Sequence, residues 1–293
     1  MKSINETFSR ILSAVVLLPL YLFCLYTEGF WNIPILIISV LVSISVLYEF
    51  YQIAILKFKS HVFVPYGIIC AIVVNVLFYF YAFSKVLGFS SQFSNLDVRI
   101  FFAVSMLLIC FIVVFQVFRR PIEGAIVSLS VTVFGIIYLV LSFAHIIFMK
   151  ALPDGFFYIL ALHAIVMVND SAAYFGGVFF GKHKAGFKVS PNKSWEGYFS
   201  GILFSIISMI VLNNIYIVFW DKNLFTVLEA GFLGAFLSLA GNVGDLIESA
   251  IKRDGGVKDS GRLIPGHGGM WDVFDALIFT IPLFYYYLKI RAL

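Results

Sequence analysis

Four carboxylates near the C-terminal end of the chain are spaced in a way that suits cation binding. Asp245 and Glu248 are three residues apart, and Asp272 and Asp275 repeat this spacing. Residues three apart lie on one face of a helix, so each pair predicts two carboxylates side by side. Such a cluster repels itself unless a cation lies among its members, and hard oxygen ligands favour Mg²⁺. The spacing therefore predicts chemistry on a charged substrate such as a phosphate.

A purely structural role competes with this interpretation. The alternatives are solvation at the helix ends or pairing with a nearby base: Lys252, Arg253 or Arg262. Glu248 lies four residues before Lys252, which favours an ion pair along one helix. Charge inside an apolar segment is costly, which favours a functional role for the other three carboxylates. The candidate catalytic and metal-binding residues are Asp245, Asp272 and Asp275.

A loop of glycines and bases precedes the last apolar segment, and three of these glycines flank His267. Glycine permits close backbone approach, and free N–H groups at a helix N-terminus attract phosphate. The bases would add positive charge, although a bland turn with solvated bases is the alternative. No acidic partner of His267 can be identified, so it is not assigned as a base. The candidate substrate-binding residues here are Lys258, Arg262, His267, Gly268 and Gly269.

A third polar element begins at Asp170, which lies within an apolar segment and is followed by a basic loop ending in SPNKSWEG, residues 190–197. Lys193 and Ser194 could contact phosphate, so Asp170, Lys193 and Ser194 are also candidate substrate-binding residues. Trp195 could stack on a base or anchor the chain at a membrane interface. The loop lysines could equally serve only to set the membrane topology.

Composition indicates which elements must position these residues. Of the 293 residues, 61% are hydrophobic and 12% are charged, against about 25% charged in soluble domains. A membrane-spanning helix needs about 20 mostly apolar residues. The sequence therefore predicts an all-α integral membrane protein, a polytopic bundle of about nine transmembrane helices. The predicted spans are 11–28, 33–55, 62–83, 100–118, 124–149, 156–180, 197–219, 224–250 and 270–290.

Loop charge predicts the orientation of this bundle. With the N-terminus in the cytoplasm, most of the 20 lysines and arginines fall in cytoplasmic segments, as the positive-inside rule requires. This orientation also places the two polar loops, 181–196 and 251–268, on the cytoplasmic side.

The two halves of the chain differ in their ionisable residues. Within residues 1–150 the spans contain almost no ionisable group, with His145 as the main exception, whereas the later spans contain several carboxylates. We therefore expect scaffold helices in 1–150 and a catalytic region in 151–293, within one continuous membrane domain. His145 and His163 are expected to be satisfied structural groups. The cysteines are expected to be buried small hydrophobic residues and not a disulfide or metal set: Cys24, Cys70 and Cys110.

Together these residues resemble the phosphatidate cytidylyltransferase family, also called CDP-diacylglycerol synthases. The resemblance is most specific over residues 249–275 and extends to 170–174, 190–197 and 244–245. The matching residues are Ser249, Lys252, Arg253, Lys258, Asp259, Gly261, Pro265, His267, Gly268, Gly269, Asp272 and Asp275. One position departs, since Val273 stands where the family usually has arginine. Either Arg253 or Arg262 compensates for the missing guanidinium, or activity is reduced.

The resemblance implies transfer of CMP from CTP to phosphatidate, giving CDP-diacylglycerol and pyrophosphate. It suggests Mg²⁺ as cofactor, with K⁺ as a candidate second cation, and a homodimer. The expected partners are CTP, phosphatidate and the lipid bilayer, and no nucleic acid. The expected location is the cytoplasmic (inner) membrane of a bacterium, multi-pass, with the active site facing the cytoplasm; an organellar membrane is the alternative.

Other classes of membrane protein remain as alternatives. A CDP-alcohol phosphotransferase would have an Asp-Gly, Ala-Arg and multi-Asp pattern, which the sequence does not contain. A polyprenol kinase is another lipid-phosphate enzyme of similar character. An ion or metabolite transporter could also use intramembrane carboxylates, but no internal repeat is found.

Overall fold

The computed structural model describes residues 15, 19–27, 29–59, 62–84, 98–119 and 121–292. Apart from isolated β-bridges, every secondary-structure element in this part of the chain is a helix. Seven helices in this part of the chain are long and apolar enough to cross a membrane. These findings confirm the prediction of an all-α polytopic membrane protein. The seven helices are Phe30–Phe58, Val64–Phe83, Ala125–Lys150, Gly155–Phe180, Trp195–Trp220, Val227–Asp254 and Met270–Arg291.

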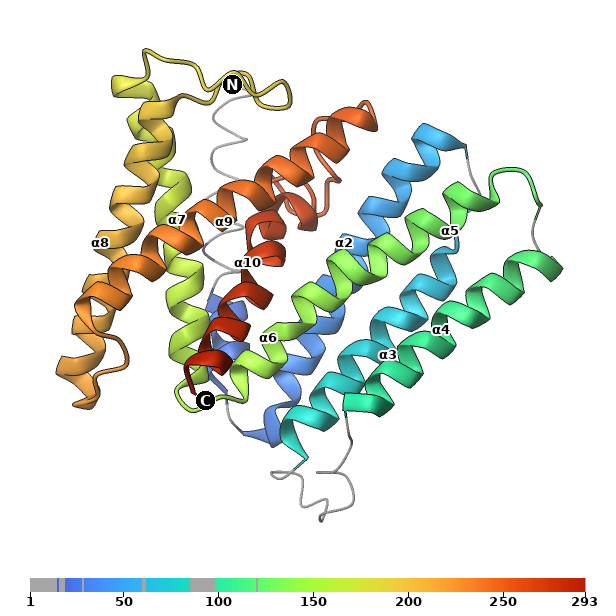
Figure 1. Cartoon of the computed structure of the whole chain (residues 1–293), viewed down its shortest axis with the longest axis horizontal. Coiled ribbons are helices and arrows are strands. Elements are labelled where there is room, and N and C mark those ends of the chain that lie inside the picture. The colour runs from blue at the N-terminus through green and yellow to red at the C-terminus, as the bar shows by residue number, and fades with distance from the viewer. Residues whose placement is uncertain are drawn as a thin grey trace. The chain divides into compact units, whose positions relative to one another are not determined.

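Two of the nine predicted spans are not among these seven. Of the first, 11–28, the structure describes residue 15, which is helical, and residues 19–27, of which 19–26 are helical; the others lie outside the described residues. The fourth, 100–118, falls in a helix at Val98–Arg119, of which Met106–Arg119 forms a shorter apolar part. The elements in chain order, of which Figure 1 labels the α-helices, are η1 (Phe30–Asn32), α2 (Ile33–Phe58), α3 (Val64–Phe83), α4 (Val98–Arg119), α5 (Ala125–Phe134), η2 (Gly135–Leu141), α6 (Ser142–Lys150), α7 (Gly155–Phe180), α8 (Trp195–Trp220), α9 (Val227–Asp254) and α10 (Met270–Arg291).

The chain divides into two compact units, each built from two stretches of sequence. One unit comprises Met1–Phe156 and Asp254–Phe274, and the other comprises Phe157–Arg253 and Asp275–Leu293. The first division lies close to the boundary expected near residue 150. The second places the polar loop between α9 and α10 in the same unit as the N-terminal helices. Candidate site residues therefore occur in both units.

The first unit packs α2 against α3 and against the continuous helix formed by α5, η2 and α6 (Figure 1). Buried Asn75 of α3 accepts a hydrogen bond from Ser39 Oγ at 2.5 Å and donates one to Ser43 Oγ at 3.2 Å, so it joins α3 to α2. A side chain at Gly67 or Gly135 would collide with the ring of Tyr51, so these glycines let the helices approach closely.

The second unit contains α7, α8, α9 and most of α10, and Figure 1 shows α7 and α8 side by side with α9 crossing them. Glycines lie where these helices meet. A Cβ at Gly201 of α8 would lie 2.6 Å from Asn169 Oδ1 of α7, and one at Gly234 of α9 would lie 2.6 Å from the Ile206 Cα of α8. Small residues let backbones approach, which is how membrane helices gain van der Waals contact.

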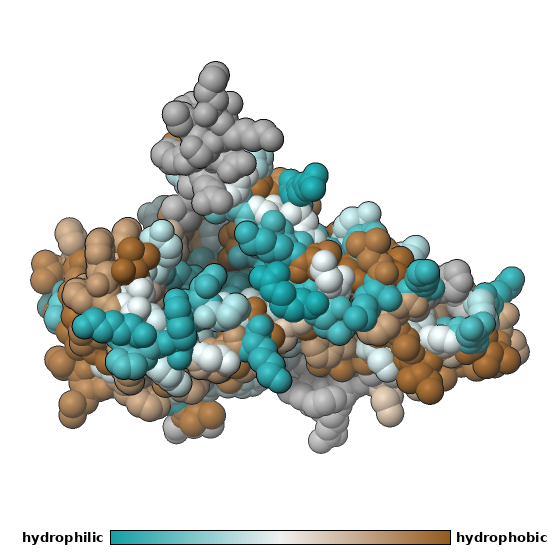
Figure 2. Space-filling view, turned by 90° about the horizontal axis from the view of Figure 1, so that it is seen from above, coloured by the Kyte–Doolittle hydropathy of each residue, from teal (hydrophilic) through white to brown (hydrophobic). Residues whose placement is uncertain are grey.

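Hydrophobic side chains cover much of the described surface, as the broad brown areas of Figure 2 show. Leu228 and Phe219, for example, are 88% and 73% exposed. Exposure of many such side chains to water would be unfavourable in free energy. Lipid tails are as apolar as these side chains, so contact with lipid carries no such penalty. This surface agrees with the membrane setting that the composition predicts.

The isolated histidines have hydrogen-bond partners in the helix backbone, as predicted. Nδ1 of His145 lies 2.6 Å from the Leu141 carbonyl oxygen, and Nδ1 of His163 lies 2.7 Å from that of Ile159. All three cysteines are free, but Cys70 is buried, Cys24 is half-buried and Cys110 is exposed, so the prediction that all three are buried is wrong for Cys110.

Candidate active site

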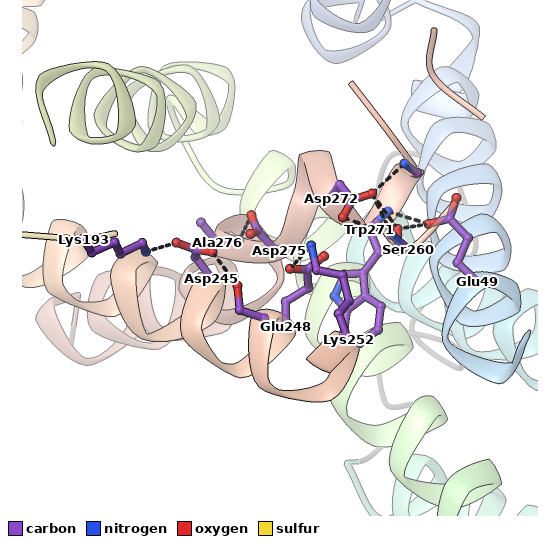
Figure 3. Close-up of polar contacts among 12 residues, drawn as sticks. Glu49, Lys193, Asp245, Glu248, Lys252, Ser260, Trp271, Asp272, Asp275 and Ala276 are labelled. Atoms are coloured by element: carbon purple, nitrogen blue, oxygen red, sulfur yellow. Dashed lines mark hydrogen bonds and ion pairs between the residues drawn. The ribbon is translucent and has the colours of Figure 1, made fainter. Parts of the chain in front are cut away.

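Three carboxylates come together in the second unit. Asp245 and Glu248 lie on α9 and Asp275 lies on α10, and one oxygen from each is within 4.8 Å of the others. Figure 3 shows these side chains pointing toward one another. The structure thus brings together two of the predicted metal-binding residues, Asp245 and Asp275, and adds Glu248. We call this group the carboxylate trio.

Gly244 explains how carboxylates from two helices come so close. A Cβ at this position would lie 2.9 Å from the carbonyl oxygen of Asp275 and 3.1 Å from the Cα of Ala276. The backbones of α9 and α10 are therefore in near contact beside Asp245. Any larger residue at 244 would separate the two helices and widen the trio.

Two lysines balance most of the charge of the trio. Lys252 Nζ lies 2.6 Å from Glu248 Oε2, and the two side chains are only 11% and 1% exposed. This pair is the one that the helical spacing predicts. Lys193 Nζ pairs with Asp245 Oδ2, and Ser249 Oγ donates to Asp245 Oδ1 at 3.3 Å. With every group ionised, three carboxylates face two ammonium groups. The cluster therefore keeps an excess of negative charge, which a further cation could neutralise.

Lys193 is held in its charged form by this arrangement. Burial alone would lower the pKa of the ammonium group, but the adjacent Asp245 carboxylate and Tyr198 hydroxyl together raise it by more, so the net shift of the Lys193 pKa is upward. The Lys193 ammonium also lies 5.5 Å from the centroid of the Tyr198 ring. Lys193 is therefore a permanent cation at neutral pH.

A cavity of about 450 Å³ opens beside the Lys193–Asp245 pair. Its walls come from α7, the following loop, α8 and α9, and Asp170 contributes an exposed carboxylate. A volume of this size suits a ligand of nucleotide dimensions. The lining residues are Asp170, Ala173, Tyr174, Gly177, Val178, Lys184, Asn192, Lys193, Ser194, Gly197, Tyr198, Asn242 and Asp245.

The loop before α8 is fixed at both ends, which positions Lys193. Ser194 is the N-cap of α8, and its buried hydroxyl accepts a hydrogen bond from the Gly197 N–H at 3.2 Å. His183 Nδ1 lies 2.6 Å from Glu196 Oε1, and the Ala185 N–H donates to the Lys193 carbonyl at 2.8 Å. Ser194 thus lines the cavity while using its hydroxyl as a cap.

Asp272 belongs to the first unit, where it caps the start of α10. Its Oδ2 accepts hydrogen bonds from the Gly269 N–H at 2.7 Å and from the N–H and Oγ of Ser260 at 2.9 and 3.1 Å. The contact with Gly269 is the backward half of a capping box, in which a carboxylate at the third helical position binds the N-cap N–H. Within this unit, Asp272 therefore closes the glycine-rich loop onto α10.

Glu49 of α2 is a carboxylate that the sequence analysis overlooked. It is only 7% exposed and accepts hydrogen bonds from the Met270 N–H at 2.8 Å, the Trp271 N–H at 2.9 Å and Ser260 Oγ at 2.7 Å. Figure 3 shows it pointing toward this turn. A single carboxylate inside an otherwise apolar span was the available signal, since such residues are functional candidates by default.

The remaining predicted residues lie in the loop before α10. Lys258, Arg262 and His267 are exposed there. Gly268 has a positive φ of 100°, and a Cβ at this position would lie 2.5 Å from Asp272 Oδ2. The N–H groups at the helix start, which were predicted to be free for phosphate, donate to Glu49 and Asp272. A substrate-binding role for these loop residues stays a prediction.

Fold and site together define a polytopic helical membrane protein with a charged, nucleotide-sized cavity. The chain matches the cytidylyltransferase family over residues 8–291 and belongs to that family. A phosphatidate cytidylyltransferase of Staphylococcus saprophyticus is 31% identical over 274 residues, 94% of this chain and 96% of that protein. One of Staphylococcus haemolyticus is 36% identical over 190 residues, 65% of this chain and 68% of that protein. One of Staphylococcus aureus (strain COL) is 43% identical over 136 residues, 46% of this chain and 50% of that protein.

Proposed function

We propose that the protein is a nucleotidyltransferase that transfers CMP from CTP to phosphatidate, giving CDP-diacylglycerol and pyrophosphate. The observation that carries this proposal is the carboxylate trio, whose Asp245 pairs with Lys193 at the wall of the cavity. The relatives named above support the choice of substrates. The alternatives, another lipid-phosphate transferase or kinase or a transporter, have no such support.

The residues present suit this reaction without a strong general base. The nucleophile is a phosphate oxygen of the lipid, which is already ionised near neutral pH. The reaction needs neutralisation of charge and in-line positioning at the α-phosphate of CTP. Lys193 supplies a fixed positive charge at the cavity, and Asp170 faces the same space. Lys258 and Arg262 remain proposed contacts to phosphate from the glycine-rich loop.

The trio fits a divalent cation because its members offer hard oxygen ligands within 4.8 Å of one another. Asp245 and Asp275 would hold Mg²⁺, with Glu248 as a third donor. When bound, Mg²⁺ supplies charge neutralisation for the reacting and departing phosphates. Asp272 was also predicted as a ligand, and that role stays a proposal, as does K⁺ as a second cation.

The excess of lysine and arginine in one set of loops supports an orientation with the site facing the cytoplasm, where CTP is found. The bacterial relatives favour the cytoplasmic membrane. A homodimer is proposed on family resemblance alone.

The test is an assay of the purified full chain with labelled CTP and phosphatidate in mixed micelles, with Mg²⁺ or with EDTA. We expect labelled CDP-diacylglycerol and pyrophosphate, both requiring phosphatidate and Mg²⁺. Asp245→Asn should abolish product, whereas Asp221→Asn, which changes an exposed carboxylate after α8, should not. Phosphorylation of diacylglycerol or of a polyprenol, with no product from phosphatidate, would instead assign a kinase.

A further inference from the structure

Helix α10 begins without a capping side chain at its N-cap position. Gly269 directly precedes Met270, so the N-cap position has no hydroxyl or carboxylate to accept the first N–H groups of the helix. These N–H groups carry partial positive charge and need acceptors when they are shielded from water. The acceptors come from Glu49 of α2, more than 200 positions earlier in the chain.

Glu49 takes the place of the missing cap. Its Oε1 accepts from the Met270 N–H at 2.8 Å, and its Oε2 accepts from the Trp271 N–H at 2.9 Å. Ser260 Oγ donates to the same Oε2 at 2.7 Å. A carboxylate buried in a helix of a membrane protein is costly unless it is hydrogen-bonded, and three donors here meet that need.

The loop is shaped around this carboxylate. A Cβ at Gly261 would lie 2.7 Å from Glu49 Oε1, and a Cβ at Gly269 would collide with Glu49 Oε2 and Ser260 Oγ. These two glycines therefore leave the space that the Glu49 side chain fills. Their role here is close packing, which differs from the phosphate cradle that glycine-rich loops often form.

Two further contacts join α2 to the same stretch of chain. Lys57 Nζ lies 3.4 Å from Asp254 Oδ1, where the loop begins. The ring of Phe50 meets that of buried Trp271 edge-on, with centroids 5.6 Å apart. Helix α2 thus holds the loop where it leaves α9 and where it enters α10.

We propose that Glu49 is a positioning residue, which caps α10 from α2 and thereby fixes Asp272 and the glycine-rich loop for the reaction. The link runs through Ser260, whose hydroxyl oxygen lies 2.7 Å from Glu49 Oε2 and 3.1 Å from Asp272 Oδ2 and shares its one proton between them. Removal of Glu49 frees the start of α10 and lets Asp272 and Gly268 move. The catalytic part of this inference rests on the proposed cytidylyl transfer, and the cap does not.

The first measurement is amide hydrogen exchange over residues 260–272 in the full chain, without substrate. Loss of a hydrogen bond to a charged acceptor changes an opening equilibrium by about tenfold or more. We expect Glu49→Ala to speed exchange at Met270 and Trp271 by about that factor, and Glu49→Gln, which keeps the shape, by less. Unchanged exchange at both amides in the two variants would overturn the cap, whatever reaction the protein performs.

The second measurement separates positioning from simple loss of stability. Asn75→Ala removes another buried polar contact of α2 in the same unit, away from the loop, and serves as the matched control. A displacement of about 1 Å can cost about 100-fold in rate. We expect Glu49→Gln to lower kcat by about tenfold or more with the KM for CTP within about twofold, and Asn75→Ala to change neither.

Each outcome of the kinetic comparison has a definite meaning. Equal losses in Glu49→Gln and Asn75→Ala, in step with their melting temperatures, would overturn the positioning role and leave Glu49 structural. If the wild-type protein shows no transfer from CTP to phosphatidate, the proposed function fails, and the exchange measurement still decides the cap. Glu49→Gln serves in both measurements should Glu49→Ala fail to fold.

Discussion

In the second unit, Asp245 and Glu248 face the ammonium groups of Lys193 and Lys252, whereas in the first unit Glu49 and Asp272 face backbone N–H groups. The same kind of side chain is thus used in two ways. An ammonium group sits on a flexible stem and can exchange its partner for a cation or a phosphate. A backbone N–H cannot leave, so the carboxylates that bind it fix the chain in place.

The largest effect is expected when Asp275 of the trio is neutralised. Loss of several kcal/mol of charge stabilisation corresponds to about 10²- to 10³-fold in rate. We expect Asp275→Asn to lose activity by that factor, with thermal stability kept or raised because one of three clustered negative charges is removed. The check is initial rate and melting temperature of the purified variant. Mg²⁺-dependent activity at the wild-type level would remove Asp275 from the site.

The second prediction concerns the buried pair on α9. Lys252→Met leaves Glu248 buried without its ammonium partner, which costs about 3–5 kcal/mol of stability. The double variant Glu248→Gln, Lys252→Met should recover much of this loss, since no unpaired charge remains. Unfolding in a denaturant series measures both. Equal destabilisation of the single and double variants would mean that the pair is not coupled.

The third prediction is that Asp272, three residues before Asp275 on α10, responds to neutralisation with a loss of stability that Asp275 does not show. Asp272→Asn weakens the acceptor of three hydrogen bonds and should cost about 1–3 kcal/mol of stability. Melting temperature should therefore fall in Asp272→Asn while it holds in Asp275→Asn. The opposite order would contradict the distinction between a carboxylate clustered in the trio and one that caps the start of α10.

The smallest effect is expected at the start of α9, which has a cap of its own. The Glu229 N–H donates to Thr226 Oγ1 at 3.2 Å, and the Thr226 N–H donates to Glu229 Oε2 at 3.3 Å, which forms a capping box. Thr226→Ala should lower stability by about 1 kcal/mol and leave the rate unchanged. A loss of rate larger than that of Glu49→Gln would show that the reaction rate depends more on the start of α9 than on the start of α10.

The sequence predicted those features that depend on neighbours along the chain. The apolar runs 33–55 and 124–149 correspond to helices Ile33–Phe58 and Ala125–Lys150, since burial of about 20 apolar residues requires a helix of that length. The Glu248–Lys252 pair followed from helical spacing alone. Residues 245 and 248 likewise share one face of α9, as expected.

Features that depend on distant segments were not predictable in the same way. Glu49 has partners 211 to 222 positions away, so neither spacing nor local charge could pair it with the start of α10. Which aspartate of α10 joins Asp245 and Glu248 depends on how α10 is rotated against α9. That rotation depends on packing between the helices, of which the close approach at Gly244 is one part, and the three-residue interval between Asp272 and Asp275 does not encode it.

Gly244 therefore has a consequence beyond packing. It has no chemical group, yet the space it leaves determines how far the oxygens of the trio stand from one another. Oxygen ligands surround Mg²⁺ at about 2.0–2.1 Å and Ca²⁺ at about 2.3–2.6 Å, so a few tenths of an ångström distinguish the two ions. For a cation bound by the trio, a methyl group at position 244 would favour the larger ionic radius, and selectivity for the ion would reside in a residue that never touches it.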